Sequence, residues 1–193
     1  MNILKTILLF LTLTIIISCT EELQSALESD YKVIELVNGY NDYINNDNQK
    51  PFIIKERNLI KIEINEKGEC IIENKYIEDS LIVSELKKYL VPNPKNNQMP
   101  ITIEKEFKYS GKVIVTKNLL VAAIYDERLN YKTYREIRDK FYSALYEVRN
   151  EFSIKRFNKT LKELQNSDVE IDISKWEEIR RVFPFHYSEI VLK

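Results

Sequence analysis

Polar and apolar residues alternate through the middle of the chain, which is the pattern of strands with one buried face. Across residues 60–65, isoleucine alternates with lysine, glutamate and asparagine. Residues 66–68 then form a tight turn in which Gly68 can take a positive φ, and a return strand starts at Cys70. The sequence therefore predicts a β-hairpin. It also predicts strands at residues 101–107, 112–116 and 119–124, and we expect the last to be the most central because it is the most apolar.

Helical periodicity takes over at Tyr131, after which apolar residues recur every three or four positions. A five-residue step separates Phe152 from Phe157, so we expect a kink or break between them. The apolar stripe comprises Tyr131, Tyr134, Ile137, Phe141, Leu145, Val148 and Phe152.

Two shorter helices are predicted from capping residues. Asp79 or Ser80 can cap a helix that ends at Leu90. Ser174 and the glutamate three residues after it have capping-box spacing, and the helix that they start should end before Pro184. Strands come before helices in this order of elements, so the sequence predicts an α+β domain with two layers.

The first residues of the chain are apolar over a short stretch only. Lys5 precedes an apolar run over residues 7–17, which is shorter than the roughly 20 residues that a membrane-spanning helix needs. A basic start, a short apolar run and small residues at the exit are typical of a secretory signal. The run ends at Cys19 in a sequence that resembles the lipobox of bacterial lipoproteins. We therefore expect a signal peptide over residues 1–18 and a lipid such as palmitate on Cys19; the alternative is a truncated membrane anchor with a chance cysteine.

The mature chain divides into three predicted parts. Residues 19–50 contain a helix that forms a surface stalk, followed by a polar linker. Residues 51–130 form the α+β core, and residues 131–193 form the long amphipathic helix and a helical tail. We expect Cys70 to be a buried free thiol, because no partner for a disulfide remains once Cys19 is acylated.

Composition argues against several classes of function. The 29 basic and 30 acidic residues give a net charge of −1, which offers no overall field for nucleic acid. With three glycines, the chain has no glycine-rich phosphate-binding loop, and we expect no cofactor and no metal site.

Catalytic chemistry is not indicated either. His186 is the single histidine and has no histidine or cysteine neighbour in the sequence. Asp126 and Glu127 follow the most apolar strand, where functional groups are often displayed, although an aspartate there can also cap a turn. An enzyme would need a cleft with convergent carboxylates around these two residues, so we expect a non-enzymatic protein.

The order of elements, together with several short motifs, resembles the periplasmic domain of the ExbD/TolR biopolymer-transport family, in the branch with an extended helical C-terminal tail. The similar stretches are LIKIEINEKGECIIEN, GKVIVTK, the tyrosine-led segment from Tyr131 and IRRVFPFHYSEI. The family places an aspartate a few residues before a tyrosine-led helix, and Asp126 and Tyr131 stand in these positions, with Tyr134 repeating the tyrosine. The resemblance implies a small mixed sheet with helices on one face. It also makes Asp126, Tyr131 and Tyr134 candidate partner-binding residues.

Family members carry a transmembrane helix with an aspartate that takes part in proton coupling with ExbB/TolQ subunits. Residues 1–20 of this chain contain no acidic residue, so we do not expect proton coupling. The resemblance implies a lipid-anchored, periplasm-facing module of the cell envelope, in either membrane, that acts by protein–protein contacts in TonB-type transport. Its expected partners are the membrane, a TonB-like or ExbB/ExbD-type protein, peptidoglycan, and a second copy in a homodimer, with no nucleic acid. The alternative is a structural lipoprotein that tethers the envelope to peptidoglycan.

Overall fold

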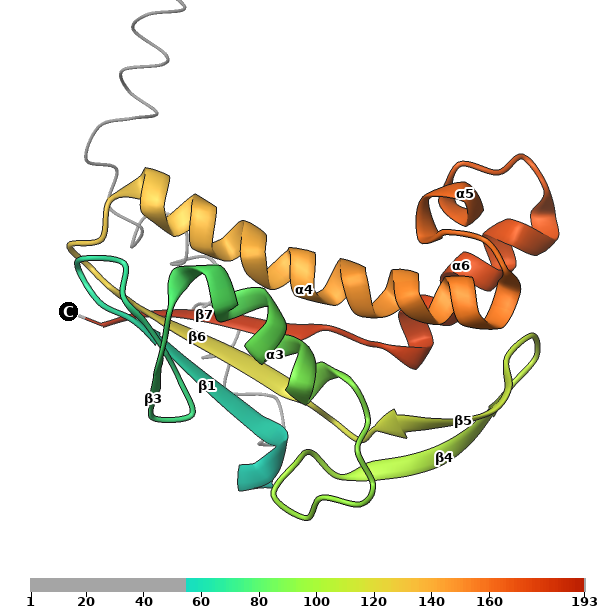
Figure 1. The fold of residues 1–193 in the computed structure, drawn as a ribbon, viewed down its shortest axis with the longest axis horizontal. Coiled ribbons are helices and arrows are strands. Elements are labelled where there is room, and N and C mark those ends of the chain that lie inside the picture. Colours follow the sequence, from blue (N-terminus) through green and yellow to red (C-terminus); the bar gives the residue numbers. More distant parts are fainter. Residues whose placement is uncertain (1–54, 193) are drawn as a thin grey trace, which may run out of the picture.

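The structure is a computed structural model and describes residues 55–192. Cys19, the predicted signal and the predicted stalk lie outside the described residues. Figure 1 shows the elements in space. In chain order they are η1 (Glu56–Asn58), β1 (Leu59–Ile64), β2 (Cys70–Ile72), β3 (Lys75–Ile77), η2 (Asp79–Leu81), α3 (Ile82–Leu90), β4 (Thr102–Phe107), β5 (Gly111–Thr116), β6 (Leu120–Asp126), α4 (Tyr131–Phe157), α5 (Leu161–Gln165), α6 (Glu170–Val182) and β7 (His186–Leu192).

The main sheet has five strands in the order β3-β2-β1-β6-β7. The β1–β2 and β2–β3 pairs are antiparallel, whereas β1, β6 and β7 run parallel to one another. The predicted hairpin is confirmed, and so is the inner position of the strand near residues 119–124, since β6 lies between β1 and β7.

Helices α3 and α4 cover one face of this sheet (Figure 1). The alternate isoleucines of β1 are buried towards them, as the period-two pattern predicted. Phe141 and Ile137 of α4 are fully buried, so the apolar stripe of the long helix forms the second layer of the core. The predicted α+β class with two layers is therefore confirmed.

Strands β4 and β5 form a separate antiparallel ribbon. Buried Asn58 fixes the base of this ribbon, because its side-chain amide donates to the carbonyl of Lys117 at 2.6 Å and its carbonyl accepts from the backbone N–H of Ile101 at 2.8 Å. From this base the ribbon extends beyond the main sheet towards α6 (Figure 1).

Helix α4 corrects the expected break between Phe152 and Phe157. The helix is continuous over Tyr131–Phe157 and ends at Asn158, which takes a left-handed φ of 54°. The rings of Phe152 and Phe157 lie 6.4 Å apart and pack edge to face, so the five-residue step brings two aromatic side chains together within one helix.

Both predicted helix caps are wrong. Helix α3 begins after a 3₁₀ turn at Asp79–Leu81 without a side-chain cap, and Asp79 pairs with Lys140 of α4 instead. Helix α6 begins at Glu170, so Ser174 lies inside it. Buried Asp172 holds the first turn of α6, where it accepts hydrogen bonds from Lys159 and Ser167.

The end of the chain corrects the expectation of a helical tail over residues 131–193. Residues after Pro184 form β7, an edge strand of the main sheet that pairs with β6 over its whole length. The last described residues are therefore part of the core sheet and not an appendage to it.

Candidate functional site

The predicted site residues lie at the junction of β6 and α4. Strand β6 ends at Asp126, and Asn130 caps α4 by accepting a hydrogen bond from the backbone N–H of Thr133 at 2.9 Å. The predicted strand-to-helix junction is therefore a short loop, and the structure places it at one end of the parallel strands.

Asp126 is part of this loop's own structure. Its Oδ1 accepts from the backbone N–H of Arg128 at 2.9 Å, and its two carboxylate oxygens each accept from the Arg128 guanidinium at 3.0 Å. These hydrogen bonds with Arg128 lower the pKa of Asp126. Arg128 also forms an ion pair with Glu66 in the β1–β2 turn, at 2.7 Å. The turn-capping interpretation of Asp126 therefore accounts for its contacts in the structure.

Tyr134 is buried, whereas Tyr131 is partly exposed beside it. The two rings lie 6.0 Å apart, and the Tyr125 ring of β6 packs edge-on against Tyr134 at 5.0 Å. The structure thus brings the two predicted tyrosines together, and it directs one of them into the interface between sheet and helix.

Sequence analysis missed the hydrogen-bonding partner of Tyr134. The Tyr134 hydroxyl donates to Glu189 Oε2 at 3.0 Å, and Arg138 Nε donates to Glu189 Oε1 at 2.9 Å. Next to this group the Tyr125 and Tyr187 hydroxyls are 2.7 Å apart. Burial raises the pKa values of Tyr125, Tyr134 and Tyr187, so these hydroxyls stay protonated to a higher pH than exposed tyrosines do. The signal was present in the sequence as the Tyr187-x-Glu189 spacing, but it has meaning only once β7 is known to be a strand.

Cys70 and His186 lie at opposite ends of the main sheet. Cys70 is buried in β2, and burial raises the pKa of its thiol to about 12. His186 lies exposed at the start of β7. Within residues 55–192, no cluster of three or more histidine, cysteine, aspartate or glutamate residues is placed to hold a metal ion.

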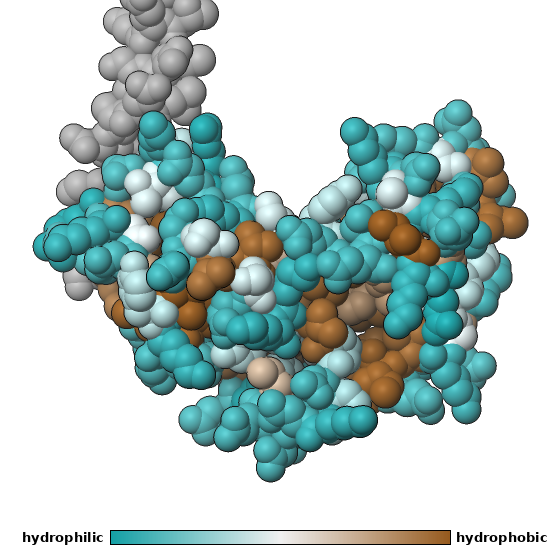
Figure 2. All heavy atoms as spheres, in the orientation of Figure 1, coloured by the Kyte–Doolittle hydropathy of each residue, from teal (hydrophilic) through white to brown (hydrophobic). Residues whose placement is uncertain are grey.

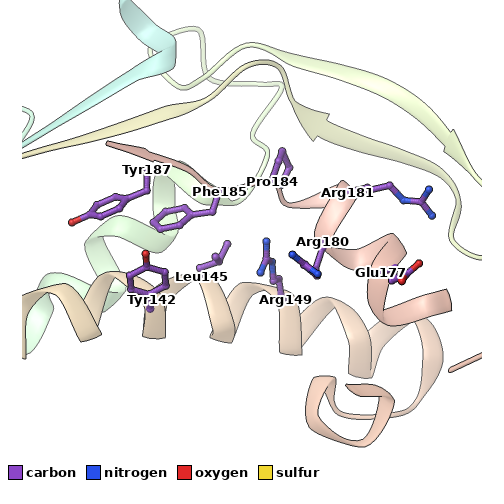
Figure 3. Close-up of a pocket in the computed structure, with 9 residues that line it drawn as sticks. All are labelled: Tyr142, Leu145, Arg149, Glu177, Arg180, Arg181, Pro184, Phe185 and Tyr187. Carbon is purple, nitrogen blue, oxygen red and sulfur yellow. The ribbon is translucent and has the colours of Figure 1, made fainter. Parts of the chain in front are cut away.

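A cavity of about 660 Å³ lies away from the junction, between α4, the end of α6 and the start of β7 (Figure 3). One wall is mainly aromatic and consists of Tyr142, Leu145, Phe185 and Tyr187. The other wall carries charged side chains, namely Arg149, Arg180, Arg181 and Glu177. Sequence analysis did not single out any of these arginines, because they come from separate helices.

A second cavity of about 620 Å³ lies between the β4–β5 ribbon and the same end of α6. It shares Arg180, Arg181 and Pro184 with the first cavity and adds Lys105 and Lys117 of the ribbon. Figure 2 shows that hydrophobic residues gather in the space between the ribbon and the helices, on a face that is otherwise mainly hydrophilic. Ile103, Phe107 and Val113 of the ribbon are partly buried against the core here.

Comparison with known proteins gives no relative: no protein-family model, no curated protein and no solved structure matches this chain. Within residues 55–192, no helix is both long enough and apolar enough to cross a membrane. The partner-binding role of Asp126, Tyr131 and Tyr134 stays a prediction, as does the lipid on Cys19.

Proposed function

We propose that this protein is a non-enzymatic, lipid-anchored module of the cell envelope that faces the periplasm and acts by protein–protein contacts in a TonB-type transport system. The resemblance to the ExbD/TolR family supports this proposal. So does the order of elements, since a hairpin, a helix, an inner strand, an aspartate and a tyrosine-led helix follow one another as that family leads one to expect.

The observation that carries the proposal is the free edge of β7. Strand β7 pairs with β6 on one side, and among residues 55–192 no strand pairs with its other side. The carbonyl of Leu192 accepts from the backbone N–H of Glu127, so the backbone groups of Leu192 face the β6 side. Because backbone groups alternate along a strand, those of Tyr187, Glu189 and Val191 face the free edge.

A free strand edge of this kind binds an extended segment by adding it to the sheet. Three residues with outward-facing backbone donors and acceptors are enough to pair with a short partner strand. The side chains of the same residues lie on the helix side of the sheet, where core packing and hydrogen bonds hold them. The edge is therefore rigid before binding, which lowers the entropy cost of association. The partner is an extended segment of a TonB-like or ExbD-type protein, or β7 of a second copy.

Proline at Val191 tests this edge, because it removes one outward N–H and leaves the pairing with β6 in place. The Val191→Ala variant is the matched control, since it loses the same side chain but keeps the donor. Each full-length variant is extracted from membranes with mild detergent, and the proteins that co-purify with it are quantified. We expect Val191→Pro to lose most of the co-purifying partner while Val191→Ala retains it. Equal retention by both folded variants would refute the edge as the binding surface.

The anchor requires a separate test. A Cys19→Ser variant should no longer incorporate labelled palmitate, and its processed form should no longer sediment with the membrane fraction. The Cys70→Ser variant is the control, and its labelling should be unchanged. Persistent labelling of Cys19→Ser would contradict the lipoprotein assignment. Binding of the chain to purified peptidoglycan sacculi without any protein partner would favour the structural tether instead.

A further inference from the structure

The cavity between α4, α6 and β7 has the size and the two-sided character of a small-molecule site. Its volume of about 660 Å³ falls within the roughly 300–1,000 Å³ that ligand pockets occupy. Such pockets combine apolar walls with a few converging polar groups, and this cavity has both.

The polar side of the cavity is formed by guanidinium groups without acidic partners. Figure 3 shows Arg149 of α4 and Arg180 of α6 side by side, with Arg181 directed the other way and Glu177 further along α6. Among the described residues, no carboxylate lies within ion-pairing distance of Arg149 or Arg180. Three arginines against one glutamate leave this lining with a charge of +2 in a chain whose net charge is −1.

The guanidinium of Arg149 is held in place by a backbone carbonyl at the end of α6. Its Nε and Nη2 donate to the carbonyl of Phe183 at 3.2 Å and 2.7 Å, which fixes the plane of the guanidinium and leaves Nη1 free to bind a ligand. Burial, with the nearby charge of Arg180, lowers the pKa of Arg149 to about 10. Two like charges held together in a partly buried place repel each other, and an anion between them removes this repulsion.

The opposite side is a rigid aromatic surface. The Phe185 and Tyr187 rings of the β7 segment are stacked, with centroids 5.3 Å apart and planes 7° apart. Tyr142 of α4 packs edge-on against both rings, at 5.6 Å and 5.9 Å. Leu145 lies between this cluster and Arg149 in Figure 3.

We propose that this cavity binds a small organic phosphate, with the phosphate group between Arg149 and Arg180 and the apolar part of the ligand against Tyr142 and Phe185. Arginine pairs recognise phosphate through several charge-assisted hydrogen bonds, and the charge of the lining matches a dianion. The lysines of the second cavity, on the other side of Arg181, extend the same positive region. This inference does not depend on the proposed protein–protein role.

Trp176 provides a built-in reporter for the test. It is the single tryptophan of the chain, and Arg180 lies over its ring at 4.9 Å. Full-length protein in non-ionic detergent is titrated with phenyl phosphate, with binding followed by Trp176 fluorescence and by calorimetry. We expect saturable binding, and we expect Arg180→Gln to weaken it by about tenfold or more because a charge-assisted contact is lost.

Arg135→Gln is the matched control, because Arg135 is an exposed arginine on α4 outside the cavity. Its affinity for phenyl phosphate should equal that of the unmodified chain, and circular dichroism should show that both variants are folded. No saturable binding, or equal affinity of Arg180→Gln and Arg135→Gln, would overturn the proposal.

Further probes identify the ligand class. Inorganic phosphate lacks the apolar part and benzoate lacks the phosphate, so both should bind at least about tenfold more weakly than phenyl phosphate if each side of the cavity contributes. If inorganic phosphate binds as tightly as phenyl phosphate, the aromatic side of the cavity does not contribute to binding. If benzoate binds as tightly as phenyl phosphate, the site does not recognise the phosphate group. Tighter binding of monomeric dihexanoyl phosphatidate than of phenyl phosphate would identify the ligand as a lipid headgroup. The reverse order would identify a soluble phosphate ester, and either order is consistent with the site.

Discussion

The carboxylate of Glu178 on α6 holds the turn of the β4–β5 ribbon through Ser110. Its Oε1 accepts from the backbone N–H of Ser110 at 2.7 Å and from the hydroxyl of the same residue at 2.6 Å, and its Oε2 accepts from the backbone N–H of Tyr109 at 2.9 Å. Glu178 is 1% exposed, so these three donors replace the water that an ionised carboxylate would otherwise bind. The contact joins two segments that are 68 residues apart and closes the far end of the space between ribbon and helices.

Glu178→Gln should destabilise the protein by about 1–3 kcal/mol, because the amide nitrogen cannot accept the hydrogen bonds that a carboxylate oxygen accepts. Glu177→Gln makes the same change at the exposed neighbouring position and should alter the free energy of unfolding by no more than about 0.5 kcal/mol. Urea unfolding measures both values. Equal stability of the two variants would show that the hydrogen bonds of Glu178 with Tyr109 and Ser110 do not contribute to the free energy of unfolding.

Tyr134→Phe should cost about 1 kcal/mol in unfolding free energy, because Glu189 loses the hydrogen bond from the Tyr134 hydroxyl, while the one from Arg138 remains. Tyr142→Phe is a suitable comparison, since its hydroxyl is exposed and its contact with Arg138 is long, at 3.3 Å. Thermal unfolding should place Tyr134→Phe clearly below Tyr142→Phe. If both melt together, the buried tyrosine–glutamate contact is not a stabilising one.

The strands near the start of the core could be predicted because their partners are close in the sequence. The alternating isoleucines of β1 need only the adjacent hairpin and a covering helix to be buried. The long helix α4 was equally clear up to Phe152, because its apolar stripe repeats over many turns. Local pattern was not sufficient beyond that point, since the five-residue step to Phe157 predicted a break that the helix does not have.

Strand β7 could not be predicted in this way, because the burial of its residues is decided by distant segments. Glu189 lies on the helix side of the sheet, where Arg138 and Tyr134 satisfy it, so an inward-facing acid interrupts the apolar alternation. The arginine-lined cavity was missed for a related reason. Arg149 and Arg180 lie 31 positions apart and come together only through the tertiary fold, in which β7 pairs with β6 and α6 lies against α4.

Gly68 should not tolerate a side chain. It has a φ of +82°, and a Cβ built on it would lie 2.5 Å from Cγ2 of Thr133 in the first turn of α4. Gly68→Ala should therefore combine backbone strain with a steric clash and cost about 1–3 kcal/mol. Gly111→Ala is the control for strain alone, because its φ is +66° and nothing lies within 4 Å.

The clash can be separated from the strain by a second substitution. Gly68→Ala should cost more than Gly111→Ala, and the difference is the cost of the clash with Thr133. Thr133→Ala removes the Cγ2 atom, so in the Thr133→Ala background Gly68→Ala should cost only the backbone strain. Urea unfolding of the two single variants and the double variant measures this coupling. Additive effects of Gly68→Ala and Thr133→Ala would show that the turn moves away from α4 instead of pressing on it.

Cys70 should make the protein less stable at alkaline pH. Burial raises the pKa of its thiol from 9.0 to about 12, with the charge of Asp79 adding to the effect and that of Lys140 opposing it. Below pH 9 the thiol is protonated in both the folded and the unfolded chain, so it adds no pH dependence there. Between pH 9 and about 12 only the unfolded chain ionises, and stability should fall with a slope that approaches about 1.4 kcal/mol per pH unit.

Cys70→Val isolates this contribution, because valine is similar in size, suits a strand and does not titrate. The difference in unfolding free energy between the parent chain and Cys70→Val should be constant up to pH 9 and should then shift steadily in favour of the variant. Tyrosines of the unfolded chain also ionise in this range, whereas burial raises the pKa values of Tyr125, Tyr134 and Tyr187 in the folded chain. This contribution is the same in both proteins and cancels in the difference. Parallel curves up to pH 11 would mean that the thiol ionises as readily in the folded chain as in the unfolded one. In that case β2 opens far more easily than its burial under α3 and α4 implies.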